Sequence, residues 1–331
     1  MKLFLFFILF SVLIIENSPN SWKILPYRFE ENFRGLSVVN DDLIWASGTK
    51  GLVIRSTDGG VSWEEHRISG ADSLDFRDIH AFDRNVAVTM SSGTPARIYL
   101  ITEGGCAWQK VWEDKLPEVF LDAMVFKNEK EGWILGDPIN SKWLLLKTAD
   151  GGKNWYPIST PESLEGEAAF AASGTNIQVI KNNIWFISGG EVSRLYHSSD
   201  NGNSWKSYFI PMKGGKTCGA FSFLMKSEKD GIVVGGDYEK SDDLMNNCFV
   251  TNDGGEKWIA VRSLPPGGYR SCISHRGEKE FITVGPNGSD YSDNRGLSWI
   301  KMGGPGFNTC GCAKKKCFAV GKGIIGKWQK N

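Results

Sequence analysis

The stretch Ser56-Thr57-Asp58-Gly59-Gly60-Val61-Ser62-Trp63 decides the fold of this chain, because its pattern is repeated along the sequence. The pattern is Ser/Thr-x-Asp-x-Gly-x-x-Trp, and clean copies end at Trp63, Trp155, Trp205 and Trp258. Two degenerate copies have Glu103 or Asn294 in the Asp position and end at Trp108 and Trp299. The tryptophans recur roughly every 40 to 50 residues, a period typical of the blades of a β-propeller.

We expect each copy, an Asp box, to be the hairpin turn between the third and fourth strands of a blade. The Asp carboxylate accepts backbone N–H groups, the Gly adopts positive φ, and the Trp starts the outer strand and packs between blades. A structural role is therefore expected for Asp58, Trp63, Asp150, Trp155, Asp200, Trp205, Asp253 and Trp258.

A second repeated feature is a strand that begins with an aromatic or aliphatic residue and finishes at a Gly, as in Trp45-Ala46-Ser47-Gly48. Its last copy ends at Gly321, after the final box, and predicts a seventh blade; six blades with a C-terminal tail are the alternative. Residues 21–25 are the candidate for the missing outer strand, and closing the ring with them removes open sheet edges. The sequence thus predicts an all-β, seven-bladed propeller of four-stranded antiparallel blades, as one domain over residues 21–331.

The N-terminus predicts export. Lys2 is followed by an apolar run over residues 3–15, which has the charge and length of a signal peptide, assigned to residues 1–20; an uncleaved anchor is the alternative. We therefore expect a secreted or periplasmic protein. The 38 basic and 38 acidic residues balance, which argues against a nucleic acid partner, and a monomer is expected.

Seven cysteines permit disulfides in an exported protein and leave at least one over. Cys310, Cys312 and Cys317 have no zinc-ligand spacing, so a buried thiol or a local disulfide is favoured over a metal site. The four histidines are scattered over the predicted blades. No metal or cofactor is expected.

The boxes resemble the bacterial neuraminidase repeats of sialidases and of several non-enzymatic propellers. The chain after residue 20, with Phe33-Arg34-Gly35-Leu36, Asp75-Phe76-Arg77-Asp78 and Gly268-Tyr269-Arg270-Ser271, is similar to the photosystem II stability and assembly factor family and its non-photosynthetic relatives. The resemblance implies docking to a membrane-protein precursor during complex assembly. Because the leader lacks the Ser- and Arg-rich composition of a transit peptide, we expect a relative outside photosynthesis with an unknown exported or membrane-protein client.

Alignment of the innermost strands by their apolar residues gives one residue per blade at one mouth of the central channel: Arg34, Arg77, Leu121, Glu167, Cys218, Arg270 and Asn308. The boxes fall on the opposite face. The predicted ligand-binding residues are Arg34, Arg77, Arg270, Glu167, Asp137 and Asp237. Arginine clusters bind carboxylates and phosphates, which predicts an anion or acidic-peptide site; ion pairs that stiffen the channel wall are the alternative.

A sialidase-like exo-glycosidase is the second hypothesis, because sialidases share the repeat. Its catalytic candidates are Asp78, Asp122, Glu167 and Tyr269. The chain has Arg34-Gly35-Leu36 where the sialidase opening motif has Arg-Ile-Pro. The preferred function is therefore an exported, non-enzymatic propeller that binds a protein or acidic peptide through its arginine-lined mouth.

Overall fold

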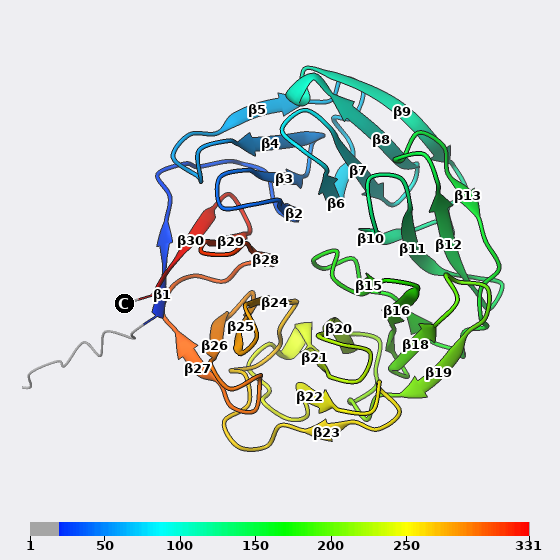
Figure 1. Ribbon diagram of the computed structural model, residues 1–331, viewed down its shortest axis with the longest axis vertical. Coiled ribbons are helices and arrows are strands. Elements are labelled where there is room, and N and C mark those ends of the chain that lie inside the picture. The colour runs from blue at the N-terminus through cyan, green and yellow to red at the C-terminus, as the bar shows by residue number, and fades with distance from the viewer. Residues whose placement is uncertain (1–19, 331) are drawn as a thin grey trace, which may run out of the picture.

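The computed structural model describes residues 20–330, which form seven antiparallel sheets arranged in a ring (Figure 1). The prediction of a seven-bladed propeller is confirmed. Apart from Asn20, the expected signal peptide lies outside the described residues. No helix within residues 20–330 has the length and apolarity needed to span a membrane.

The first three blades each use four consecutive strands, which run from the channel to the rim. Blade 1 contains β2 (Phe33–Val38), β3 (Ile44–Gly48), β4 (Leu52–Ser56) and β5 (Glu64–Arg67). Blade 2 contains β6 (Asp75–Ala81), β7 (Ala87–Ser92), β8 (Ala96–Thr102) and β9 (Ala107–Asp114), with the short 3-10 helix η1 (Glu103–Gly105) in its degenerate box. Blade 3 contains β10 (Leu121–Phe126), β11 (Gly132–Ile139), β12 (Lys142–Thr148) and β13 (Tyr156–Pro157).

The next three blades follow the same order. Blade 4 contains β15 (Ile177–Ile180), β16 (Asn183–Ile187), β18 (Arg194–Ser198) and β19 (Lys206–Phe209). Blade 5 contains β20 (Cys218–Met225), β21 (Gly231–Asp237), β22 (Cys248–Thr251) and β23 (Ile259–Ala260), with the 3-10 helix η2 (Tyr238–Lys240) after β21. Blade 6 contains β24 (Cys272–Arg276), β25 (Glu280–Gly285), β26 (Gly288–Ser292) and β27 (Ile300–Met302).

Blade 7 joins the two ends of the described chain. Its strands are β28 (Thr309–Cys312), β29 (Cys317–Val320), β30 (Ile325–Lys330) and, outermost, β1 (Asn20–Ile24). Trp22 of β1 lies opposite Trp328 of β30, and its indole Nε1 donates to Ser289 Oγ of blade 6 at 3.0 Å. The predicted closure by the N-terminal strand is confirmed.

The core lies between neighbouring blades, because the second strand of each blade is buried on both faces. β3 and β16 are buried over their whole lengths, and Trp45, Trp133 and Trp185 are fully buried. Trp45 of blade 1 packs in one cluster with Phe76 of blade 2. Every blade is therefore stabilised by both of its neighbours.

The Asp boxes form the turns between third and fourth strands, and strand direction places them on the face opposite the start of the innermost strands. Asp58 Oδ1 accepts the backbone N–H groups of Val61 and Ser62, both at 2.9 Å. Hydrogen bonds from the Ser62 hydroxyl and N–H lower the pKa of Asp58 to about 2. In the equivalent turn of blade 3, Trp155 Nε1 donates to Gly152 O at 3.1 Å.

The predicted innermost strand of blade 4 is wrong. Glu167 lies in β14 (Glu167–Ala168), a two-residue strand that pairs with β17 (Gly189–Gly190) and extends the sheet of blade 5. The innermost strand is β15, which starts at Ile177. Residues 169–176, which we call the plug, precede it and project toward the centre of the ring (Figure 1).

The plug is hydrogen-bonded to blades 5, 6 and 7. Ser173 Oγ donates to Ser271 O of blade 6 at 2.7 Å, and Thr309 Oγ1 of blade 7 donates to Ser173 O at 3.2 Å. The hydroxyls of Thr175 and Ser222 of blade 5 lie 2.7 Å apart. The chain therefore fills its own channel below the mouth.

Candidate binding site at the channel mouth

Four innermost strands carry one extra residue close to their starts. In blade 1, Phe33 pairs with Gly48 and Gly35 pairs with Ser47, so Arg34 is left unpaired as a β-bulge. The same shift in register leaves Arg77, Asp122 and Phe221 unpaired in blades 2, 3 and 5. A bulge redirects a side chain, and here it turns one residue per blade toward the channel.

In blades 6 and 7, Ser271 and Asn308 hold the equivalent position, directly before the first paired residue of the strand. The column predicted from sequence was therefore correct at Arg34, Arg77 and Asn308. At Leu121 and Arg270 the predicted residue lies one position before the one that holds this place in the structure, and at Cys218 it lies three positions before it. Apolar alternation alone cannot show where a bulge interrupts it.

Three of the four bulge residues, Arg34, Arg77 and Phe221, line a cavity of about 330 Å³ at the channel mouth, whereas Asp122 is buried outside it. Its lining includes four aromatic rings, from Phe170, Phe221, Tyr238 and Tyr269, next to Arg34, Arg77, Ser271 and Asn308. Phe170, Ala171 and Ala172 belong to the plug, which therefore forms part of the lining. The result is a pocket with an aromatic wall and two cationic side chains.

Arg34 is the side chain with unused hydrogen-bonding capacity. Within residues 20–330 it makes no ion pair or hydrogen bond, and its Nε is buried without a partner. Burial and the neighbouring positive charge of Arg77 lower the pKa of Arg34, although Asp75 and Tyr269 oppose this. Because a guanidinium stays charged in proteins, Arg34 presents donors and a positive charge to the cavity.

Arg77 is held in place by its neighbours. Its Nε donates to Asp75 Oδ2 at 2.6 Å, and its Nη1 donates to Ala171 O of the plug at 2.9 Å. The two arginines therefore differ: Arg77 is neutralised and supports the cavity floor, whereas Arg34 keeps its charge exposed to a ligand.

Arg270 does not reach the cavity. Its side chain is fully buried in blade 6, where Nε donates to Asp290 Oδ2 at 2.6 Å and Nη1 donates to Asn287 Oδ1 at 2.6 Å. The sequence predicts that three arginines meet at the channel mouth, and this prediction is wrong for Arg270. For Arg270 the geometry matches the alternative, an ion pair that stiffens the wall.

The predicted acidic residues do not line the cavity. Glu167 is buried against Arg194, whose Nη2 donates to Glu167 Oε2 at 2.5 Å. Burial acts to raise the pKa of Glu167, but hydrogen bonds, that from Arg194 first, outweigh burial and lower this pKa. Asp237 accepts from Thr217 Oγ1 at 2.8 Å and from Glu239 N at 3.0 Å, and so caps η2. It thereby orients the turn that carries Tyr238.

Asp137, the third predicted acidic residue, and the catalytic candidates Asp78 and Asp122 also lie outside the lining of the cavity. Burial raises the pKa of Asp78 well above its ordinary value, although the N–H groups of Met124 and Ile79 donate to it. Burial and the nearby Asp137 likewise raise the pKa of Asp122. Burial raises the pKa of Asp137 to about 6, although Ala169 N donates to it at 2.8 Å.

Of the four candidate catalytic residues, only Tyr269 lines the cavity. Its ring is packed edge-on to Phe221 at a centroid distance of 4.7 Å, and burial raises its pKa. Asp78 and Asp122 are buried, and Glu167 is committed to Arg194.

Sequence reasoning missed the aromatic wall of Phe170, Phe221 and Tyr238. A usable signal for Phe221 existed. The Gly that finishes the second strand pairs with the residue before the bulge, as in Leu121 opposite Gly136 and Ala220 opposite Gly235. Phe170 lies on the plug and Tyr238 on η2, and neither element follows the repeat.

Comparison with known proteins finds similarity to the same family that the repeated boxes and the strand motifs resemble. Residues 14–119 match the family model of the Photosynthesis system II assembly factor YCF48. The Photosystem II assembly lipoprotein Ycf48 of Synechococcus sp. (strain CC9902) is 23% identical over 278 residues, covering 73% of this chain and 78% of the relative. The chain is an assembly-factor-like propeller of the neuraminidase-repeat type.

Two solved structures extend the likeness over the whole ring. The structure described as YCF48 bound to D1 peptide superposes on the assembly-factor-like propeller with a TM-score of 0.68 and 15% identity, covering 97% of this chain and 100% of the other. YCF48 from Cyanidioschyzon merolae gives a TM-score of 0.66 and 14% identity, covering 93% and 99%. At these identities the structures establish a shared fold.

Proposed function

We propose that this protein is an exported, non-enzymatic binding module that holds a segment of a client protein in the cavity at its channel mouth. The observation that carries the proposal is Arg34, a guanidinium that lines the cavity without an ion pair from residues 20–330. A half-buried cation lacking a partner is costly to maintain, and a ligand carboxylate would supply the missing charge and hydrogen bonds.

The rest of the cavity supports a peptide rather than an inorganic anion. Phe170, Phe221, Tyr238 and Tyr269 offer ring surface, which a phosphate or sulfate could not use but an apolar or aromatic side chain would. Ser271 and Asn308 add polar groups beside the rings. We therefore propose a ligand segment in which an acidic group lies next to an apolar or aromatic side chain.

The relatives support a client of the membrane-protein kind. One similar protein is named an assembly lipoprotein, and one similar structure contains a D1 peptide. A lipoprotein is exported, which agrees with the export expected from the leader. The client of this chain is proposed to be an exported or membrane-protein segment, bound by a single copy of the propeller.

Fluorescence anisotropy with the D1 peptide of the relative as the labelled probe tests the proposal. Arg34→Ala should weaken binding by roughly 10-fold or more, because a charge-assisted hydrogen bond contributes about 1.5–3 kcal/mol. The matched control is Arg262→Ala, which removes an exposed arginine outside the cavity. A second probe with every carboxylate amidated should bind as weakly to the native protein as the first probe binds to Arg34→Ala.

Equal binding of both probes, or of Arg34→Ala and native protein, would refute a carboxylate site at Arg34. Turnover of a fluorogenic sialoside that Arg77→Ala abolishes would instead support the glycosidase hypothesis.

A further inference from the structure

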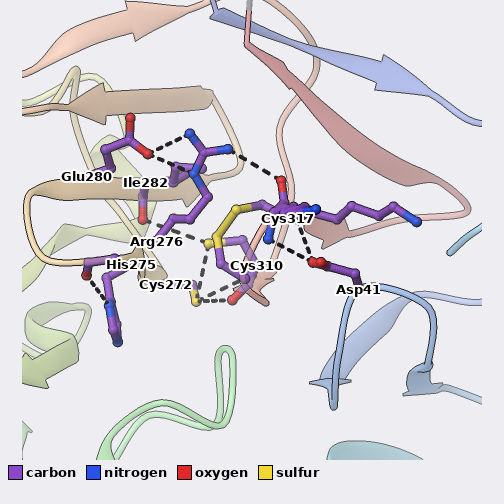
Figure 2. The surroundings of a disulfide bond; sticks show 12 residues. Asp41, Cys272, His275, Arg276, Glu280, Ile282, Cys310 and Cys317 are labelled. Atoms are coloured by element: carbon purple, nitrogen blue, oxygen red, sulfur yellow. Dashed lines mark hydrogen bonds and ion pairs between the residues drawn. A yellow bond between two sulfur atoms is a disulfide. The ribbon is translucent and has the colours of Figure 1, made fainter.

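Four cysteines lie in one buried cluster between blades 6 and 7 (Figure 2). Cys312 and Cys317 face each other across the β28–β29 hairpin and form a disulfide. Cys272 of β24 and Cys310 of β28 are thiols, and both are buried. The proposed peptide-binding function uses none of the four.

Cys272 and Cys310 are in direct contact. Their sulfur atoms lie 3.8 Å apart, and the backbone N–H of Cys310 donates to Cys272 Sγ at 3.3 Å. The hydroxyl of Thr309, whose single proton is shared with Ser173 O, lies 3.6 Å from the same sulfur. A sulfur that accepts several hydrogen bonds is stabilised as a thiolate, which is the nucleophilic form of cysteine.

The protonation states of the pair are complementary. Burial acts to raise the pKa of Cys272, but the hydrogen bonds from Cys310 and Thr309 outweigh it and bring this pKa to about 6. Burial and the neighbouring Cys272 raise the pKa of Cys310. Cys310 Sγ–H donates to Cys272 Sγ, and Cys272 is the more acidic thiol of the pair.

Cys310 also lies beside the disulfide. It is two residues from Cys312 on β28, and residues two apart on a strand point to the same face. Cys272, Cys310 and the Cys312–Cys317 bond consequently belong to one cluster of side chains, and Figure 2 shows Cys272, Cys310 and Cys317 together.

We propose that Cys272 and Cys310 are a modification site, a dithiol pair that exchanges with the Cys312–Cys317 disulfide, so that a Cys272–Cys310 disulfide linking blades 6 and 7 replaces it. In the first step Cys310 loses its proton to the Cys272 thiolate and attacks Cys312 Sγ. The Cys310–Cys312 bond forms, the Cys312–Cys317 bond breaks, and Cys317 leaves as a thiolate. In the second step Cys272 gives its proton to the Cys317 thiolate and attacks Cys310 Sγ, so that the Cys272–Cys310 bond forms and Cys312 leaves.

The balance needs no external oxidant. One disulfide and two thiol groups are present before and after the two steps, and no electron enters or leaves the protein. The exchange moves the cross-link from within one hairpin to a position between two blades.

The loop of the β28–β29 hairpin also favours thiol–disulfide exchange, because it is positively charged. Residues 313–316 include three successive lysines, and Cys312 is half-buried. Asp41 of blade 1 accepts the N–H groups of Lys315 and Lys316, at 2.8 and 2.9 Å, and so fixes the loop. Positive charge next to a disulfide stabilises the leaving thiolate and attracts anionic thiols such as glutathione.

The new cross-link would lie next to the binding cavity. Ser271, directly before Cys272, donates through Oγ to Asn308 O at 2.6 Å, and both residues line the cavity. Joining Cys272 to Cys310 would therefore restrain the wall of the cavity formed by blades 6 and 7.

Disulfide mapping of the full native chain tests the proposal. The protein is held at pH 8 without added oxidant, quenched with acid, alkylated and analysed by mass spectrometry for linked peptides. We expect a Cys272–Cys310 link together with equal alkylation of Cys312 and Cys317, at roughly 10-fold above the background of Cys310→Ser. Cys106→Ser, which removes an exposed thiol, should leave the link unchanged.

Cys272→Ser provides a second measurement, because it stops the exchange after the first step and should accumulate a Cys310–Cys312 link. Near-ultraviolet circular dichroism establishes that each variant is folded. If native protein shows only the Cys312–Cys317 link at pH 8, with Cys272 and Cys310 always alkylated after unfolding, the proposal is wrong. This outcome leaves the proposed peptide binding untouched, since the anisotropy assay measures it separately.

Discussion

The ring of Phe170 lies parallel to the ring of Phe221, with 4.0 Å between their centroids and 4° between their planes. Phe170 belongs to the plug and Phe221 is the bulge residue of blade 5, so the stack joins two departures from the propeller repeat. Tyr269 of the same cluster packs edge-on to Phe221. The wall of the cavity is thus built where the chain leaves its regular pattern.

Phe170→Ala should weaken binding of the labelled D1 peptide and destabilise the protein by about 1–3 kcal/mol, through loss of a stacked pair and part of a buried ring. Anisotropy measures the first effect and urea unfolding the second. Phe209→Ala, on the exposed rim strand β19, is the control and should change neither by much. Unaltered binding by Phe170→Ala would show that the ligand does not use the aromatic wall.

Gly174→Ala should destabilise the protein strongly. Gly174 has φ of +68°, and a Cβ there would come within 2.4 Å of the buried Asp78 carboxyl group. The expected loss is about 2–4 kcal/mol, as strain at positive φ and steric overlap add. Gly277→Ala is a matched control, because φ is +64° there but nothing lies within 4 Å of the added Cβ. Urea unfolding of the two variants separates strain from overlap, and equal losses would mean that the plug yields to the added methyl group.

The fold could be predicted because the Asp box repeats its turn chemistry in residues that are visible in the sequence. Asp58 and its counterparts fix one turn per blade, and the Gly at the end of each second strand fixes another. Gly321 then revealed a blade without a box. Such signals are local, and a β-turn is determined mostly by its own residues.

The site was harder to predict, because it depends on offsets of one residue and on a segment without a pattern. Arg34 and Arg77 were found since the strand alignment happened to start at their bulges. The alignment predicts Arg270 at the position that Ser271 holds in the structure. A shift of one residue along a strand turns the side chain from the channel to the interior of the blade. The plug has the small residues of an ordinary loop, and its location follows only from contacts with Ser222, Ser271 and Thr309 in blades 5, 6 and 7.

Asp137→Asn should stabilise the protein at neutral pH. Burial raises the pKa of Asp137 to about 6 from an ordinary value of 3.8, so folding favours the protonated form. Its contribution to stability is fully present below pH 4 and is lost as pH rises through 6. The variant, which can still accept the N–H of Ala169, should gain about 1 kcal/mol at pH 7 and little at pH 4.

Urea unfolding of Asp137→Asn at several pH values measures this difference. Asp237→Asn is an informative control because the pKa of Asp237 is shifted in the opposite direction. Burial acts to raise this pKa, but the hydrogen bonds from Thr217 and Glu239 outweigh burial and lower it. That variant should lose stability at neutral pH. A gain from Asp137→Asn that is equally large at pH 4 would exclude titration of Asp137 as the cause.

Trp22→Ala should destabilise the ring by about 3–5 kcal/mol, the usual cost of removing a buried tryptophan. The Trp22 ring lies 5.3 Å from that of Phe307, and its indole bonds to blade 6, so its loss weakens the joint between the last two blades. Lys23→Ala, which changes an exposed residue of the same strand, should have little effect. Thermal unfolding checks both variants, and an unchanged midpoint in Trp22→Ala would mean that β1 contributes little to closure.

Asp200→Asn should be tolerated far better than Asp200→Ala, because the chain already contains an Asn box. Asp200 Oδ1 accepts the N–H of Ser204 at 2.8 Å, and Oδ2 accepts the Ser204 hydroxyl at 2.7 Å. Asn294 reproduces both contacts with Ser298: its Oδ1 accepts the N–H at 3.0 Å, and its Nδ2 donates to the hydroxyl at 2.7 Å. An amide therefore preserves the turn, whereas alanine leaves the N–H of Ser204 without its acceptor.

The two Asp200 variants also separate charge from geometry. Hydrogen bonds from Ser204 and Ser198 lower the pKa of Asp200 to about 2, so its contribution to stability is present above pH 4 and is lost as pH falls through 2. Thermal unfolding at pH 7 should place Asp200→Ala a few degrees below native protein and Asp200→Asn between them. Between pH 4 and pH 2 the gap between native protein and Asp200→Asn should shrink, because the carboxylate loses its charge while the amide does not titrate. A gap that stays constant over this range would show that the box depends on the shape of its side chain and not on its charge.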